Sequence, residues 1–289
     1  MLSMIRNADV KGGGSSVYWS ITAEFDRGLV KAGLANIGLA HRTPQPRTDE
    51  AALAHALRGV YNDTKKYSVV AKEKQSDDGF EVMGIQRGKG AQRNQYSLTA
   101  TYKVGPAGVE HVDGSGQELG RVRTAYMEAK ACITHSAVGK SLVDLVTLDL
   151  GGVSLRPHGG IYWVPGSGME TLDKFGQVLS MSRTSGRCDI YRLTSVMDVE
   201  TVKAVRDALA DEVAKEITEL EQDMAKPETG KRALINRQKH AEAVMAKLKD
   251  YESILGQSLK QMMEPMERAE QSLTEAVFTR YGAELIGAQ

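Results

Sequence analysis

The sequence predicts an α+β protein: an antiparallel β-meander with packed helices, followed by a long C-terminal helical hairpin or coiled-coil arm. Three observations predict this fold class. Short segments over residues 67–104 are separated by turn-rich stretches, residues 95–104 alternate between apolar and polar side chains, and the last third of the chain carries a sustained helical apolar seam. We therefore expect an α+β body over residues 1–197 and an arm over residues 198–289.

The N-terminal residues are rich in glycine and serine around 12–16, which predicts a loop-like leader followed by a helix over residues 20–34. A second helix is expected over residues 48–61, because Thr48 can cap it and the acidic residues after Thr48 favour its first turn. Both helices belong to the predicted body.

Three strands are expected next, over residues 67–74, 80–87 and 95–104. Helices are predicted over 117–133, 138–148 and 169–181, and further strands over 161–164 and 188–196. In the strand at 95–104, the alternating apolar side chains are those of Tyr96, Leu98, Ala100 and Tyr102. Because the order does not repeat a βαβ unit, it indicates α+β rather than a doubly wound sheet.

The arm is predicted to begin with a helix over residues 202–224, where apolar residues recur at helical spacing. A second and longer seam runs over residues 234–276, and a kink is expected near Pro265 because proline removes a helical hydrogen bond. The longer seam cannot be covered by the shorter helix alone, so apolar surface should be left for a second copy or another partner. The expected oligomerisation residues are Leu234, Val244, Leu248, Tyr251, Leu255, Leu259, Met262, Met266 and Leu273.

The total charge is balanced at 37 basic and 37 acidic residues, but residues 27–48 and 87–109 contain no acidic residue. The second stretch places basic side chains in a glycine-rich hairpin loop, and the alternation predicts that its two tyrosines share a face of the following strand. A basic loop over an aromatic sheet face is one way in which proteins hold single nucleic-acid strands, although the same tyrosines also suit a core. The candidate residues are Arg87, Lys89, Arg93, Tyr96, Tyr102 and Lys103.

Two glycine-containing segments have weaker chemical meaning. Arg156 with Gly159 and Gly160 forms either a plain turn or a turn that binds a carboxylate or phosphate. The segment over residues 134–141 ends like a phosphate-binding loop, but Thr134 stands where that motif requires glycine. We expect a turn between two helices there.

Catalytic and metal-binding signatures are missing from the sequence. The six histidines are scattered, and Cys132 and Cys188 have no ligand-like neighbours, so we expect buried thiols, no cofactor and a non-enzymatic protein. No apolar run approaches the roughly 18 residues of a membrane span, and we expect a cytoplasmic protein without membrane contact.

The segment over residues 155–165, with its basic-proline turn, paired glycines and the run from Ile161 to Pro165, resembles a segment of uncharacterised proteins from phages, plasmids and archaeal mobile elements. The resemblance implies a mobile-element protein without a known enzyme activity. Such proteins are sometimes encoded near MoxR-type AAA+ ATPases and von Willebrand A proteins, so an AAA+ ATPase is an alternative partner. The leading hypothesis from the residues is a homo-oligomeric interaction protein, and nucleic-acid binding is the alternative.

Overall fold

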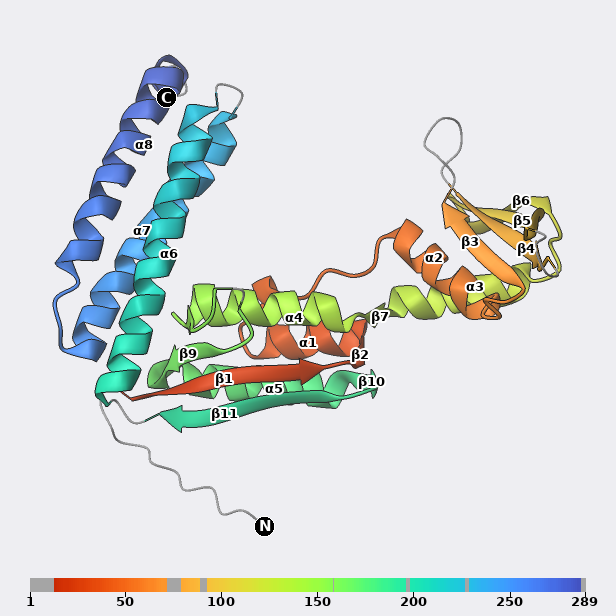
Figure 1. Cartoon of the computed structure of the whole chain (residues 1–289), viewed down its shortest axis with the longest axis horizontal. Coiled ribbons are helices and arrows are strands. Elements are labelled where there is room, and N and C mark those ends of the chain that lie inside the picture. The colour runs from red at the N-terminus through yellow and green to blue at the C-terminus, as the bar shows by residue number, and fades with distance from the viewer. Residues whose placement is uncertain are drawn as a thin grey trace, which may run out of the picture. The chain divides into compact units, whose positions relative to one another are not determined.

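The computed structural model describes residues 13–71, 79–88, 93–157, 159–195, 198–226 and 229–286, with side chains to residue 281. The architecture is mixed α/β with antiparallel sheets, as the sequence predicts (Figure 1). The chain groups into two compact units. Unit 1 comprises Met1–Ser20, Val143–Lys174 and Asp189–Gln289, and unit 2 comprises Ile21–Leu142 and Phe175–Cys188. This grouping differs from the predicted boundary at residue 197, because the C-terminal helices share a unit with earlier strands.

The described helices and strands follow one another in this order: β1 (Gly14–Ile21), β2 (Glu24–Asp26), α1 (Arg27–Asn36), α2 (Asp49–Val60), β3 (Tyr67–Ala71), β4 (Phe80–Gln86), β5 (Gln95–Gly105), β6 (Gly108–Gly114), α3 (Leu119–Ala131), β7 (Cys132–Ile133), α4 (His135–Asp144), β8 (Val153–Ser154), β9 (Tyr162–Pro165), α5 (Met169–Ser182), β10 (Arg183–Ser185), β11 (Cys188–Ser195), α6 (Val199–Ala225), α7 (Lys231–Leu255) and α8 (Lys260–Ile286). Single helical turns lie at Ala40–Arg42, Leu145–Asp149 and Gly166–Gly168.

The meander of unit 2 has the predicted three strands and a fourth, β6, that the sequence analysis missed; their order is β3-β4-β5-β6. Helices α2 and α3 cover one face. The core between them includes Leu53, Leu57, Val82, Tyr102 and Val122. As predicted, Thr48 caps α2, accepting a hydrogen bond from Ala51 N at 3.2 Å. A second, three-stranded sheet in unit 2 has the order β10-β2-β7.

The N-terminal segment differs from the prediction of a leader and a helix over residues 20–34. Residues from Gly14 form strand β1, which pairs antiparallel with β9, and the helix begins only at Arg27 after Asp26 caps it. The β-branched and aromatic side chains of β1 favour a strand. Gly14 allows this pairing, because a Cβ there would lie 2.2 Å from a ring carbon of Trp163.

Unit 1 is built around a bundle of α6, α7 and α8, which lie side by side in Figure 1. Ion pairs from Glu212 to Lys247 and from Asp223 to Arg237 show that α6 and α7 are antiparallel. The chain reverses after α7 at Gly256, whose φ of 62° lies in the left-handed region that glycine adopts without strain. The break therefore falls at Gly256 rather than near Pro265, which lies inside α8.

The C-terminal seam is enclosed by the chain itself. Its residues form one core with Val153, Trp163 and the apolar face of α6. Of the nine predicted oligomerisation residues, eight are buried and Met262 packs against them; the eight are Leu234, Val244, Leu248, Tyr251, Leu255, Leu259, Met266 and Leu273. The expectation that apolar surface remains for a second copy is therefore wrong for the residues that the structure describes. The seam predicted over residues 234–276 is divided between α7 and α8, and the reversal between these helices lets each bury the other.

Replacing Leu248 with alanine tests this assignment, because Leu248 is fully buried in the bundle. We expect the free energy of unfolding of unit 1 to fall by about 2–5 kcal/mol, the usual cost of such a cavity. Both tryptophans, Trp19 and Trp163, lie in unit 1, so urea unfolding followed by tryptophan fluorescence reports this unit. The exposed Lys249→Ala is the control. A Leu248→Ala protein with unchanged stability but a smaller particle mass would instead show that Leu248 lies in an oligomer interface.

Candidate functional site

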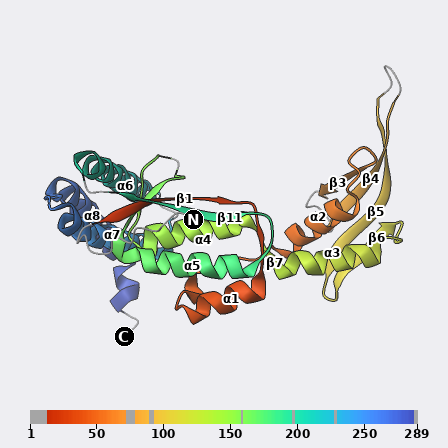
Figure 2. The same ribbon diagram turned by 90° about the horizontal axis from the view of Figure 1, so that it is seen from below.

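The first candidate surface is the ribbon formed by β4 and β5 in unit 2, which extends past α2 and α3 in Figure 2. Its register contains one irregularity. Val82 pairs with Ala100 and the next residue, Met83, pairs with Leu98, so Thr99 has no partner on β4 and forms a β-bulge. An extra residue shifts the alternation of side chains by one, so the strand presents different faces on the two sides of the bulge.

The bulge separates the two tyrosines that the sequence analysis placed on one face. Tyr102 is fully buried against the helices, whereas Tyr96 is 58% exposed and Leu98 is 42% exposed. The position of Gly84 confirms the geometry, because a Cβ there would approach the hydroxyls of Thr99 and Ser97 at 3.0 and 3.3 Å. Ser97 therefore shares the side of Gly84, and its neighbours Tyr96 and Leu98 lie on the opposite face.

The exposed face of the distal ribbon carries a small apolar patch. Met83 is paired with Leu98 and Ile85 with Tyr96, and residues directly opposite one another share a face. These four side chains, which we call the ribbon patch, are partly or largely exposed. Of these four residues the sequence predicted only Tyr96 as part of a binding surface, because without the bulge Leu98 belongs to the core.

The charges at the distal end of the ribbon patch are basic, whereas Glu81 lies on the same face at its other end, two residues before Met83. Arg87 and Arg93 are exposed at its distal end, and no acidic residue occurs between Glu81 and Glu110 in the sequence. Ile85 N donates to the carbonyl of Lys66 at 2.7 Å, which places this exposed lysine beside the patch. Lys66 also forms an ion pair with Asp63 at 3.5 Å.

The remaining predicted residues of this site lie elsewhere. Lys89 is outside the described residues. Tyr102 donates or accepts a hydrogen bond with the hydroxyl of Tyr61 at 2.9 Å in the core. Lys103 lies at the other end of β5, where it pairs in register with Glu110 of β6. The structure thus brings Arg87, Arg93 and Tyr96 together and separates Tyr102 and Lys103 from them.

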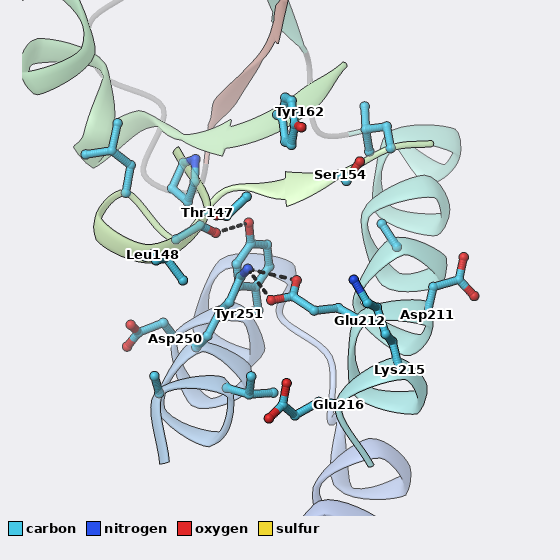
Figure 3. A pocket seen from close by; sticks show the side chains of 18 of the residues that line it. Thr147, Leu148, Ser154, Tyr162, Asp211, Glu212, Lys215, Glu216, Asp250 and Tyr251 are labelled. Carbon is cyan, nitrogen blue, oxygen red and sulfur yellow. Dashed lines mark hydrogen bonds and ion pairs between the residues drawn. The ribbon is translucent and has the colours of Figure 1, made fainter. Parts of the chain in front are cut away.

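Unit 1 contains the second candidate, a groove of about 1580 Å³ between α6, α7 and the loops around β8 and β9 (Figure 3). Lys247 lies at its floor with 9% of its side chain exposed. Its Nζ donates to both carboxylate oxygens of Glu212 and to the carbonyl of Gly152, each at 2.8 Å. Tyr251 donates to the carbonyl of Gly151 at 2.7 Å.

These contacts make the groove floor a structural clamp. The three hydrogen bonds occupy all three N–H donors of Lys247, so its ammonium has no free donor for a ligand. Burial lowers the pKa of Lys247, and the carboxylate of Glu212 opposes this effect. Burial also raises the pKa of Tyr251, which keeps its hydroxyl protonated as a donor. The clamp ties α6 and α7 to the glycine loop before β8.

The predicted anion-binding turn lies at the rim of the same groove. Gly159 N donates to the carbonyl of Arg156 at 3.0 Å, and Gly159 and Gly160 both have positive φ. A Cβ at Gly159 would lie 2.6 Å from the hydroxyl of Tyr162. A tight turn between β8 and β9 therefore explains both glycines, while anion binding by Arg156 stays a prediction.

The remaining candidate sites from the sequence are the segment that ends like a phosphate-binding loop and the two cysteines. The segment that ends like a phosphate-binding loop lies at the start and inside of α4, where Thr134 accepts a hydrogen bond from Ala137 N at 3.2 Å. Cys132 and Cys188 are half-buried, and burial raises the pKa of the Cys132 thiol. Within the described ranges, no group of His, Cys, Asp and Glu could hold a metal ion, and no helix is both long and apolar enough to cross a membrane.

Fold and surfaces together define a mixed α/β protein with an enclosed helical bundle and an exposed ribbon patch. The chain belongs to a family of unknown function, DUF6744, whose model matches residues 14–281. No curated protein and no solved structure matches the chain. The comparisons therefore establish the family, and the geometry alone supports any statement about function.

The clamp predicts the effect of breaking its ion pair. Glu212→Gln leaves the buried ammonium of Lys247 without its counter-charge, and such losses cost about 3–5 kcal/mol. We expect a corresponding decrease in the urea midpoint of tryptophan fluorescence. The double variant Glu212→Leu with Lys247→Met should lose less, because no buried charge remains. Equal losses in the single and double variants would show that the charge pairing is unimportant.

A second pair on the bundle predicts a pH dependence. His240 Nδ1 lies 2.8 Å from Glu216 Oε2, and this hydrogen bond raises the pKa of His240 above 6.5. A group with a raised folded pKa contributes stability below its unfolded pKa and loses it as the pH rises through the folded pKa. We therefore expect the stability advantage of the natural protein over His240→Gln to be present at pH 6 and to decline above it. A pH-independent difference in urea midpoint would contradict this assignment.

Proposed function

We propose that this protein binds nucleic acid through the distal β4–β5 ribbon. The supporting observation is the ribbon patch: Tyr96 and Leu98 are exposed, and the charged side chains at the distal end of the ribbon beside them, those of Arg87 and Arg93, are positive. Exposed aromatic and apolar side chains flanked by arginines suit a polyanion that also offers flat base faces. The neighbouring cations supply contacts to phosphates.

The charge of the whole unit supports the same ligand. Unit 2 contains 19 Lys and Arg against 13 Asp and Glu, whereas unit 1 contains 18 against 24. The balanced total therefore combines a net charge of +6 in unit 2 with −6 in unit 1. A positive unit attracts a polyanion over distances of about a Debye length, near 8–10 Å at physiological salt.

The argument for self-association no longer holds, because the apolar seam on which it depended is enclosed by the chain. The described surface of the bundle offers no equivalent argument for an oligomer interface. Nucleic-acid binding is therefore the function that the geometry supports best.

The proposal predicts salt-dependent binding of a fluorescently labelled oligonucleotide, measured by fluorescence anisotropy. Each phosphate contact contributes about 0.7–0.9 to the slope of log affinity against log salt concentration. Replacing both Arg87 and Arg93 with alanine should therefore reduce the slope by about 1.4–1.8 and weaken binding at low salt.

The matched control is Arg58→Ala, since Arg58 is an exposed arginine of α2 in the same unit. This substitution removes one positive charge at a site away from the ribbon, and per charge removed it should weaken oligonucleotide binding less than the ribbon substitutions. Absence of binding to both single-stranded and duplex probes would refute the proposed function. Equal effects of the ribbon and control substitutions, per charge removed, would show that binding is not located at the ribbon.

A further inference from the structure

We infer that the ribbon patch is a base-stacking platform, and that the ligand of this site is single-stranded rather than duplex nucleic acid. The inference rests on the proposed function and adds the class of ligand. It depends on four side chains, Met83, Ile85, Tyr96 and Leu98, which the bulge at Thr99 brings to one exposed face.

The four side chains form a compact two-by-two arrangement. Met83 faces Leu98 and Ile85 faces Tyr96 across the ribbon, where paired Cβ atoms are about 4.5–5.5 Å apart. Residues two apart along a strand are separated by about 6.6–6.8 Å. The patch therefore has the lateral dimensions of one or two bases laid flat on a strand pair, with Tyr96 as the aromatic member.

The size and surroundings of the patch favour bases over a protein partner. A stable protein–protein interface uses about 20–30 residues on each side, far more than these four. A nucleic-acid strand needs only a stacking surface with cations beside it, and Arg87 and Arg93 supply those cations. Charge complementarity thus identifies a polyanion with exposed flat groups.

The orientation of the polar side chains distinguishes a single strand from a duplex. A duplex buries its base faces and displays base edges, which proteins read with hydrogen-bonding side chains. On this ribbon, Ser97 and Thr99 lie on the side of Gly84, away from Tyr96 and Leu98. The four side chains of the patch can therefore stack on unpaired bases and carry no amide or charged group that would read base edges.

The test compares three labelled probes of equal length in anisotropy titrations: a mixed-sequence single strand, its duplex, and a single strand with abasic sites. We expect the intact single strand to bind at least about tenfold more tightly than the duplex or the abasic strand, because one stacked base contributes about 1–3 kcal/mol. The phosphate contacts remain available in all three probes.

Substitutions at Tyr96 separate stacking from charge. Tyr96→Ala should weaken binding of the intact single strand about tenfold or more and leave the abasic strand nearly unchanged, whereas Tyr96→Phe should keep the affinity. Met127→Ala is the control, since Met127 is a 65% exposed apolar residue of α3, which packs on the other face of the sheet. Its effect should be negligible for every probe.

The bulge provides an independent variant. Deletion of Thr99 should remove the bulge but leave Leu98 opposite Met83 and Tyr96 opposite Ile85, so both side chains should stay on the exposed face and the preference for intact bases should be kept. Leu98→Ser keeps the bulge but removes an apolar member of the patch, so it should weaken binding of the intact single strand several-fold while sparing the abasic strand.

The outcomes separate this inference from the proposed function. Salt-dependent binding with equal affinity for the single strand, the duplex and the abasic strand would overturn the stacking platform and leave nucleic-acid binding standing. Equal loss of intact and abasic binding in Tyr96→Ala would do the same. Binding of no probe would overturn both, and an apolar peptide or a second copy would then be the better occupant of the patch.

Discussion

The exposed and buried faces of the β4–β5 ribbon depend on one residue of β5, Thr99, that has no partner on β4. On one side of this bulge, Val82, Ala100 and Tyr102 face α2 and α3 and form the core of the meander. On its other side, Tyr96 and Leu98 turn away from the helices and remain exposed. An apolar strand that extends beyond its covering helices would otherwise simply continue the core pattern. The bulge instead converts the end of a core strand into a surface, and the proposed binding of nucleic acid depends on that conversion.

The two units meet different physical demands. In unit 1, three long helices enclose their own apolar seam, and Trp163 from β9 packs against Tyr251 of α7 with ring centroids 5.7 Å apart. The buried clamp of Lys247 and Glu212 then ties these helices to the loop before β8. In unit 2, the helices cover only part of the sheet and an apolar patch is left exposed. The buried apolar surface of the bundle favours a structural role for it, and the exposed apolar patch of the ribbon favours a role in interaction.

The negative charge of unit 1 and the positive charge of unit 2 have a functional meaning under this proposal. A neutral total suppresses long-range attraction of the whole chain to polyanions, while a positive unit keeps a local attraction. Binding would then depend on short-range contacts at the ribbon, where Arg87, Arg93 and Tyr96 lie together. Such a site combines a modest salt dependence with a contribution from base stacking, which distinguishes it from a uniformly basic surface.

The sequence by itself determined the mixed architecture, three strands of the meander, the cap of α2 at Thr48 and the apolar faces of the C-terminal helices, because each depends on local periodicity or a local hydrogen bond. Only the tertiary structure decided which segments of the chain pack or pair with one another. The reversal at Gly256 divides the predicted seam between two packed helices, so that apolar residues predicted to join two copies form the core within a single chain. The pairing of β1 with β9 made a strand of residues predicted to be loop and helix. The bulge at Thr99 can be recognised only when the register of both strands is known, because alternation within a single strand gives no sign of an unpaired residue.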